Sequence, residues 1–307
     1  MEENKKAAIE KIYRLTKQDA EFNEELRKRL GMTSSANSVV IDDDRLSQIY
    51  EYCIEKIIRK QAEEFYSDFP IKSIVDILEE DFIRMESFRR KDNFGDFCLS
   101  LYQQIECITN KLCEDSTLND ITSNMWGCPA YVKSEKDIPI EISNRINGDY
   151  SIANLIFPGL NKKTGNLHSI EKSQSALQTQ VAKDKMKIIV YFLGYRATMK
   201  SSDYDSYREF TSLLGDIYQC RNMNHRGNTQ NDWEIAVYER IYPLKSFYYF
   251  KFMGGLAQYV DCIKSGFDFI PEIKKYSDSI GKQKVSIPMP KVLGKIEIKD
   301  DGKKRFK

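Results

Sequence analysis

The chain has 307 residues, of which 41% are hydrophobic and 30% are charged, so it is long enough for one large domain or two small ones. Its 47 basic residues nearly balance its 46 acidic residues, which excludes a nucleic-acid or membrane partner recognised by net charge alone. No apolar run approaches the roughly 20 residues of a membrane span, and the N-terminus lacks the apolar core of a signal peptide. We therefore expect a bacterial-type cytoplasmic protein without a membrane partner.

Amphipathic helices are predicted in the first third of the chain. Residues 5–30 carry a rough apolar stripe, and Gly31 is suited to end that helix. The polar stretch that follows reads as a linker, so residues 1–40 form an N-terminal helix and linker. The next helix is predicted over residues 45–69, and Pro70 ends it.

Two more helices are predicted before the sequence changes character. The first follows Pro70, because apolar residues recur on one face at helical spacing. Those residues are Ile74, Ile77, Leu78, Phe82 and Met85. The second covers residues 92–113, with Gln104 and Glu106 beside its apolar stripe. These two polar side chains would orient a catalytic group and shape an RNA-binding site, or they would belong to a solvated helix face.

Proline and glycine become frequent between Glu114 and about Val181, where short alternating runs such as residues 138–142 occur. A stretch of this length is too long for a plain loop. We therefore predict an irregular insertion at residues 115–182, with room for a short β-hairpin.

Helices are predicted again after the insertion, at about residues 183–199 and 203–220. A Gly- and Asn-rich break follows, and a long aromatic helix then covers about residues 232–265 with a bend near Pro243. Its aromatic side chains would fill a core or form an interface. The predicted fold is therefore mainly α. Its parts are the N-terminal helix and linker (1–40), a helical bundle (41–114 plus 183–265), the insertion (115–182) and a basic C-terminal tail (266–307).

The break contains the sequence RNMNHRG, from Arg221 to Gly227, with one of only two histidines in the chain. One interpretation is that Arg221, His225 and Arg226 cap a helix end, where cations pair with exposed carbonyl groups. The other is chemical, because a histidine transfers protons near neutral pH and an arginine holds a phosphate in a bidentate contact. If the stretch is helical, Arg221 and His225 lie about one turn apart on the same face.

The chemical interpretation points to RNA cleavage. RNA carries its own nucleophile, the 2′-hydroxyl group, so cleavage requires a proton-transfer group and a positive charge but no metal. The chain has no metal-binding motif, and its seven cysteines lack CxxC spacing and read as buried free thiols. The second histidine, His168, reads as a surface or capping residue. A basic turn at residues 84–94 would contact RNA phosphate or belong to a solvated face.

The RNMNHRG motif between two amphipathic helices resembles the nuclease motif of the HEPN (higher eukaryotes and prokaryotes nucleotide-binding) domains. The resemblance implies a HEPN-like helical bundle. It also implies a metal-independent endoribonuclease, without cofactor, that cleaves single-stranded RNA or tRNA loops. Arg221 and His225 would be catalytic, and Asn222, Asn224 and Arg226 would shape the RNA-binding site.

The resemblance also bears on assembly. Sites in that family are usually composite, with two motifs facing each other across a dimer cleft, and this chain has one motif. A homodimer or higher even oligomer is therefore implied, with RNA and a regulatory or antitoxin protein as partners. The setting would be phage defence, a toxin–antitoxin pair or a CRISPR-associated system. The dry part of the dimer contact is predicted at Tyr218, Trp233, Val237 and Tyr238.

The spacing of the motif leaves a second function open. Only three residues separate Arg221 from His225, which is shorter than the usual spacing in that family. This favours an alternative in which the chain is a non-catalytic, HEPN-like nucleotide- or protein-binding subunit of a defence assembly.

Overall fold

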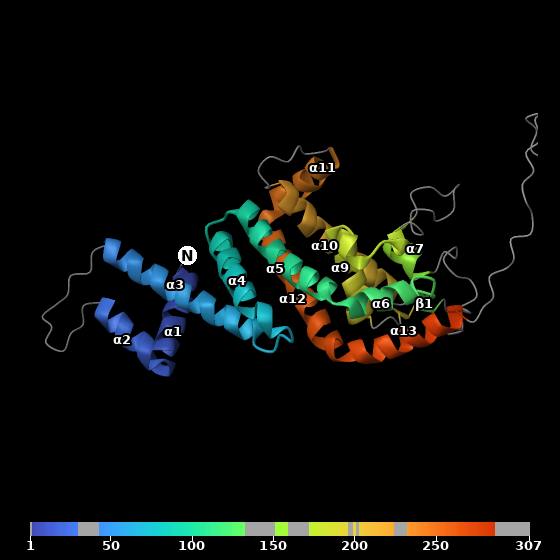
Figure 1. The fold of residues 1–307 in the computed structure, drawn as a ribbon. Coiled ribbons are helices and arrows are strands. Elements are labelled where there is room, and N and C mark those ends of the chain that lie inside the picture. The colour runs from blue at the N-terminus through green and yellow to red at the C-terminus, as the bar shows by residue number, and fades with distance from the viewer. Residues whose placement is uncertain are drawn as a thin grey trace, which may run out of the picture. The chain divides into compact units, whose positions relative to one another are not determined.

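The computed structural model describes residues 2–29, 43–132, 151–158, 172–195, 199–200, 203–223 and 232–285. These residues are mainly helical, which confirms the predicted fold class (Figure 1). The chain divides into two compact units, which are considered separately. Unit 1 comprises Met1–Lys111 and Ser206–Phe267, and unit 2 comprises Leu112–Asp205 and Asp268–Lys307. Within the described ranges, no helix is both long enough and apolar enough to cross a membrane.

The α-helices that lie wholly or mostly in unit 1 are α1 (Glu2–Gln18), α2 (Ala20–Arg29), α3 (Asp43–Tyr66), α4 (Val75–Arg90), α5 (Phe94–Glu114), α10 (Asp203–Met223), α11 (Asp232–Ile241) and α12 (Lys245–Gly266). Short 3-10 turns are η1 (Lys72–Ile74), η4 (Tyr242–Leu244) and η5 (Phe267–Phe269). The predicted bend near Pro243 is confirmed, because η4 separates α11 from α12. Proline cannot donate the backbone hydrogen bond that a continuous helix would require there.

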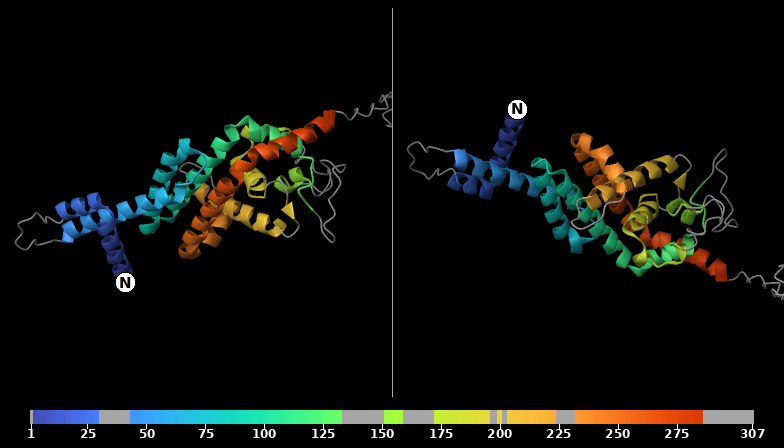
Figure 2. Two further views of the ribbon diagram at one scale, coloured as in Figure 1. Left: turned by 90° about the horizontal axis from the view of Figure 1, so that it is seen from below. Right: turned by 90° about the horizontal axis from the view of Figure 1, so that it is seen from above.

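The single helix predicted over residues 5–30 is wrong, because two helices meet at Asp19. The Asp19 carboxylate accepts a hydrogen bond from the backbone N–H of Phe22 at 2.9 Å, as an N-cap does, and α2 begins there. Phe22 then packs with Leu26, Ile49 and Cys53 in a small core between α2 and α3. Figure 2 shows α2 beside the N-terminal half of α3.

The core of unit 1 is built on α5, α10 and α12, which lie side by side (Figure 1). Phe97 of α5 contacts Tyr249 of α12 with 4.8 Å between ring centroids, and further along the same helices the hydroxyls of Thr109 and Tyr259 are 2.8 Å apart. The later residue of α5 contacts the later residue of α12, so the two helices run in the same direction. Helix α10 runs the opposite way, and its C-terminal end lies beside the N-terminal half of α5.

An unusual backbone conformation joins the α4–α5 turn to the start of α12. Asp92 has a φ of 56°, in the left-handed region that aspartate tolerates better than most residues. Its carboxylate accepts hydrogen bonds from Lys245 Nζ at 2.6 Å and from the Tyr249 hydroxyl at 3.3 Å. These bonds lower the pKa of Asp92, the one from Lys245 most strongly. The turn therefore fixes where α12 begins.

Unit 2 contains α6 (Ser116–Met125), α7 (Ile152–Ile156), η2 (Leu177–Thr179), α9 (Ala182–Ile189), a π-helical turn η3 (Val190–Gly194) and α13 (Ile270–Val285). Two short strands, β1 (Tyr131–Val132) and β2 (Met199–Lys200), pair in parallel. The predicted hairpin run at residues 138–142 lies outside the described residues.

Two predictions for this part of the chain are wrong. Residues 116–125 form a helix instead of irregular structure, because the Asp115 carboxylate caps it by accepting from the Thr117 N–H at 2.8 Å. Residues 270–285 form α13 instead of a tail. Helix α13 packs against α6, where Lys274 Nζ lies 3.6 Å from Asp120 Oδ2. The basic end of the predicted tail, after residue 285, lies outside the described residues.

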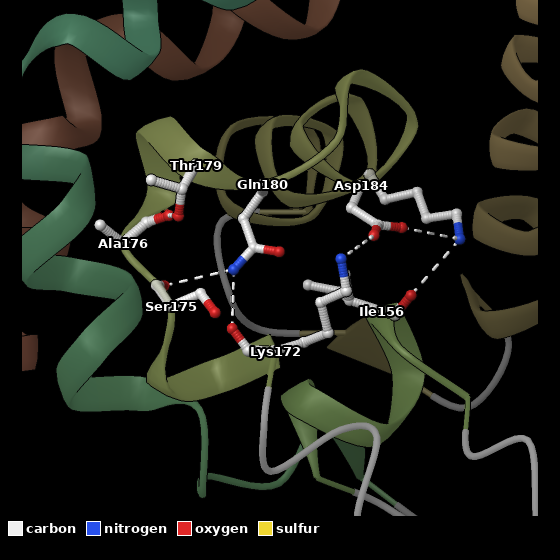
Figure 3. Close-up of polar contacts among 8 residues, drawn as sticks. Ile156, Lys172, Ser175, Ala176, Thr179, Gln180 and Asp184 are labelled. Carbon is white, nitrogen blue, oxygen red and sulfur yellow. Dashed lines mark hydrogen bonds and ion pairs between the residues drawn. The ribbon is translucent and has the colours of Figure 1, made fainter.

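Polar groups join α7 and α9 to the segment that precedes α9 (Figure 3). Gln180 Nε2 donates to the backbone oxygen of Lys172 at 2.7 Å. The Asp184 carboxylate lies between Lys187 Nζ at 3.7 Å and Lys172 Nζ at 3.9 Å. Lys187 Nζ also donates to the backbone oxygen of Ile156 at 3.4 Å, and burial lowers the pKa of its ammonium group. A single carboxylate therefore lies near both lysines, and Lys187 gains a backbone carbonyl as a second acceptor.

None of the seven cysteines forms a disulfide, which confirms that they are thiols. Five of them are buried, and Cys107 and Cys262 are half-buried. Burial raises the pKa of the Cys113 thiol to about 11 and that of the Cys262 thiol to about 11. Both groups are therefore protonated and unreactive at neutral pH.

Adjacent glycines in α12 provide a matched pair of stability tests. A Cβ atom at Gly255 would lie 3.0 Å from Leu213 Cδ2 in α10, whereas a Cβ atom at Gly254 would meet nothing within 4 Å. Gly254→Ala should raise the free energy of unfolding by about 0.5–1 kcal/mol, because alanine favours helix. Gly255→Val should lower it by about 1–3 kcal/mol, because the larger side chain overpacks the contact with α10. Chemical denaturation measures both, and similar effects from the two substitutions would contradict this packing argument.

Candidate functional site

Helix α10 extends further than predicted and ends at Met223, so Arg221 and Asn222 belong to its last turn. A basic residue in this position is favourable, because the backbone carbonyls at a helix C-terminus carry partial negative charge. The remaining predicted residues of the motif, Asn224, His225 and Arg226, lie outside the described residues, as does His168. The site is therefore described from its arginine outward.

Arg221 lies over the ring of Tyr102, a residue of α5. The guanidinium carbon is 5.1 Å from the centroid of the Tyr102 ring, within the range of a cation–π contact. The Tyr102 ring also packs edge-on against Tyr218, one turn before Arg221 in α10, at 5.5 Å between centroids. The guanidinium therefore lies over a ring that is itself packed against Tyr218.

Of the Arg221 nitrogens, Nη1 has a hydrogen-bond acceptor and Nε has none among the described residues. Its Nη1 donates to Oδ1 of Asn222 at 3.0 Å, and Asn222 is itself only 8% exposed. Its Nε is buried and has no hydrogen-bond partner among the described residues. A buried N–H without a partner costs about 1–3 kcal/mol, and an anion that reached this group would remove that cost. Asn222 therefore contacts Arg221 directly, and its role in shaping an RNA-binding site stays a prediction.

The positive charge of Arg221 is not balanced within the described part of the chain, where no carboxylate forms an ion pair with it. By contrast, Arg240 of α11 contacts Asp216 of α10 at 2.7 Å. Residues 224–231, which follow the helix, contain no acidic residue. Among the described residues, Arg221 therefore contacts the Tyr102 ring and the Asn222 amide oxygen.

Glu106 lies one helical turn after Tyr102 in α5 and on the same side of the helix. Burial raises the pKa of the Tyr102 hydroxyl well above its usual value, the charge of Glu106 raises it further, and the charge of Arg221 lowers it. Glu106 and Arg221 thus act on the same hydroxyl group. Glu106 therefore lies on the side of α5 that carries Tyr102, and its predicted role at the site stays a prediction.

Gln104 does not join this group. It is fully buried, and its Oε1 accepts a hydrogen bond from the Tyr66 hydroxyl at 2.8 Å. Its Nε2 donates to the backbone oxygen of Ser100 at 3.1 Å. Both ends of the amide are used in the interior, so Gln104 holds α5 against α3 and is not placed to touch RNA.

The side chains predicted at a dimer contact are largely used within unit 1. Val237 is 8% exposed, so it belongs to the core. Tyr218 packs on Tyr102, and Tyr238 stacks on Tyr242 at 4.9 Å between centroids. The side chain of Trp233 lies outside the described residues. Tyr218, Val237 and Tyr238 therefore already pack within their own chain.

Tyr102 is the residue that sequence reasoning missed. It falls between the apolar positions of α5, and nothing in its local pattern marks it as a partner of Arg221. The one available signal was its spacing of four residues from Glu106, which places both on one face.

Among the described residues, no group of three His, Cys, Asp or Glu side chains is arranged to hold a metal ion. No family model, curated protein or solved structure matches the chain. The function is therefore argued from the residues themselves.

The contact between Arg221 and Tyr102 can be measured by a double-mutant cycle on unfolding free energy. Tyr102→Leu, Arg221→Met and the double variant should show a coupling energy of about 0.5–1 kcal/mol, because the cation loses its aromatic partner. Tyr102→Phe is the matched control and should retain the coupling, since the ring and not the hydroxyl faces the guanidinium. A coupling energy of zero would contradict the described contact.

Proposed function

We propose that the protein is a metal-independent endoribonuclease of the HEPN type, which cleaves single-stranded RNA or tRNA loops. Arg221 holds the scissile phosphate and His225 transfers protons. Asn222, Asn224 and Arg226 shape the site. The cellular setting of such an enzyme would be phage defence, a toxin–antitoxin pair or a CRISPR-associated system.

One observation carries the proposal. Arg221 is held by Tyr102 and Asn222, and no described carboxylate neutralises it. A fixed guanidinium suits a phosphate, because it stays charged and offers parallel N–H donors. His225 follows four positions later, so the proton-transfer group that the chemistry requires is near in sequence.

The proposed reaction needs one group that accepts a proton and one that donates a proton. The 2′-hydroxyl oxygen attacks the adjacent phosphorus while a base removes its proton. The bond from phosphorus to the 5′ oxygen breaks while an acid protonates that oxygen. The products carry a 2′,3′-cyclic phosphate and a 5′-hydroxyl. Two copies of His225, one from each subunit of a dimer, would supply both groups.

Alanine variants test the pair of residues. Arg221→Ala and His225→Ala should each lower the cleavage rate of a single-stranded RNA by about 100-fold or more, because each removes a group that acts in the transition state. The double variant should lose little more, since residues that act as one unit are not additive. A fluorescent RNA assay measures the rates, and His168→Ala is the matched control that should keep full activity.

The short spacing of the motif favours a binding-only subunit over an enzyme. Two further results would decide between these two functions. The wild type should cleave equally well in excess EDTA and leave cyclic phosphate ends. Full activity of His225→Ala, or 3′-hydroxyl products that require magnesium, would contradict the proposed chemistry. RNA binding without cleavage by the wild type would support the non-catalytic alternative.

Assembly is tested separately. We expect a homodimer or higher even oligomer by light scattering, with specific activity that falls on dilution, because the site needs two motifs. Charge placed at Val237 is not a suitable probe, since that residue is buried in unit 1. A monomer at micromolar concentration that still cleaves RNA would show that one motif suffices.

A further inference from the structure

The start of α12 exposes several large apolar side chains. Tyr242 is 44% exposed, Leu244 58%, Phe247 61% and Phe250 67%. The neighbouring Tyr248, Tyr249 and Phe252 are buried, so aromatic residues occupy both the inner and the outer side of this helix. Four such side chains lie within nine residues, and exposed apolar side chains grouped in this way mark binding surfaces. We call Leu244, Phe247 and Phe250 with Tyr242 the aromatic face.

Cations lie over the rings of the aromatic face. The guanidinium carbon of Arg89 is 5.6 Å from the Phe250 centroid, and Lys251 Nζ is 5.9 Å from that of Phe247. Lys245 Nζ is 5.6 Å from the Tyr242 centroid. Exposed rings and positive charges therefore occur together on this part of the chain.

The charge around the aromatic face is positive. Residues 242–254 contain two lysines and no acidic residue. Lys245 is paired with Asp92, but no described carboxylate forms an ion pair with Lys251. Arg89 and Arg90 share the buried carboxylate of Glu86, at 2.8 Å and 3.7 Å, and Lys91 in the adjacent α4–α5 turn is exposed. The cations near the face therefore still outnumber the carboxylates. A second copy of the chain that docked through the same face in a two-fold contact would bring like charges together, which disfavours self-association here.

We propose that the aromatic face, with Arg89 and Lys251, binds single-stranded RNA. Unpaired bases present flat π surfaces that stack on exposed rings, and the phosphates between them require positive charge, so one ligand uses both features. An acidic peptide would meet the charges but has no flat surface of this kind for each ring. A duplex keeps its bases stacked inside and cannot use the rings. The identity of the ligand as RNA rests on the proposed function.

Helix α12, which carries the aromatic face, and Arg221 both contact α5. Phe94 and Phe97, in the first turn of α5, contact Tyr249 of α12, and Arg221 lies over Tyr102 two turns later in α5. The aromatic face and Arg221 are therefore both anchored to the N-terminal half of α5, within unit 1.

The test measures fluorescence anisotropy of a labelled 2′-O-methyl oligouridine of about 12 nucleotides, a length that suits stacking surfaces and a sugar that cannot be cleaved by 2′-hydroxyl attack. Phe247→Ala and Phe250→Ala should each weaken binding by about fivefold to a hundredfold. Phe250→Tyr should bind like the wild type, because the ring remains. Lys251→Gln should reduce the dependence of affinity on salt.

Tyr13→Ala is the matched control. Tyr13 is 58% exposed and has Lys17 Nζ 4.7 Å above its ring, but it lies on α1, so its loss should not change RNA binding. Unchanged binding by the Phe247→Ala/Phe250→Ala double variant, with unchanged melting temperature, would overturn the proposal. So would equal affinity for a blunt RNA duplex, or conversion of an oligomer to a monomer without loss of RNA binding.

The probe separates this inference from the proposed function, since its binding needs no catalysis. A wild type that binds through the two phenylalanines but cleaves no RNA would reject the nuclease alone. A wild type that cleaves RNA, and keeps both cleavage and binding when the phenylalanines are replaced, would reject the aromatic face alone.

Discussion

The close approach of α10 and α12 at Gly255 determines where the candidate site lies. Because position 255 has no side chain, Leu213 and Ile217 of α10 can lie directly against the α12 backbone. This approach sets the position of the following turn of α10, where Tyr218 meets Tyr102 of α5. The same Tyr102 ring then carries the guanidinium of Arg221. The position of a charged group at the helix end is therefore a consequence of packing in the middle of the helix.

The environment of Arg221 distinguishes two explanations of why an arginine occurs there. A capping role explains the residue type, because cations are favourable at helix C-termini. It does not explain a guanidinium seated on an aromatic ring with a buried Nε that has no described partner. Arg240, which ends the next helix, shows the alternative, since its charge is matched by Asp216. A capping role therefore explains the residue type of Arg221 but leaves its contact with Tyr102 unexplained.

The sequence was informative where a physical signal is local. Apolar periodicity located most of the helices, and Pro243 marked the break between α11 and α12. It failed where a single capping side chain decided the outcome, as at Asp19 and Asp115, because periodicity does not show such caps. It also failed for Ile77, which shares the predicted apolar face of α4 but is 53% exposed. The motif identified Arg221 as a candidate. Its contact with Tyr102 depends on the packing of α5 against α10, and no local sequence pattern predicts that packing.

The two proposals give Arg221 and the aromatic face different roles in unit 1. Together these roles determine which RNAs the protein would distinguish. Stacking on Phe247 and Phe250 depends on the π faces that every base has, so it selects unpaired RNA but tolerates any sequence. Arg221 contacts phosphate, which is also the same in every nucleotide. Neither contact reads the edge of a base. A nuclease with these two elements would therefore recognise RNA by its lack of pairing, and a preference for one sequence or one tRNA loop would have to come from other contacts.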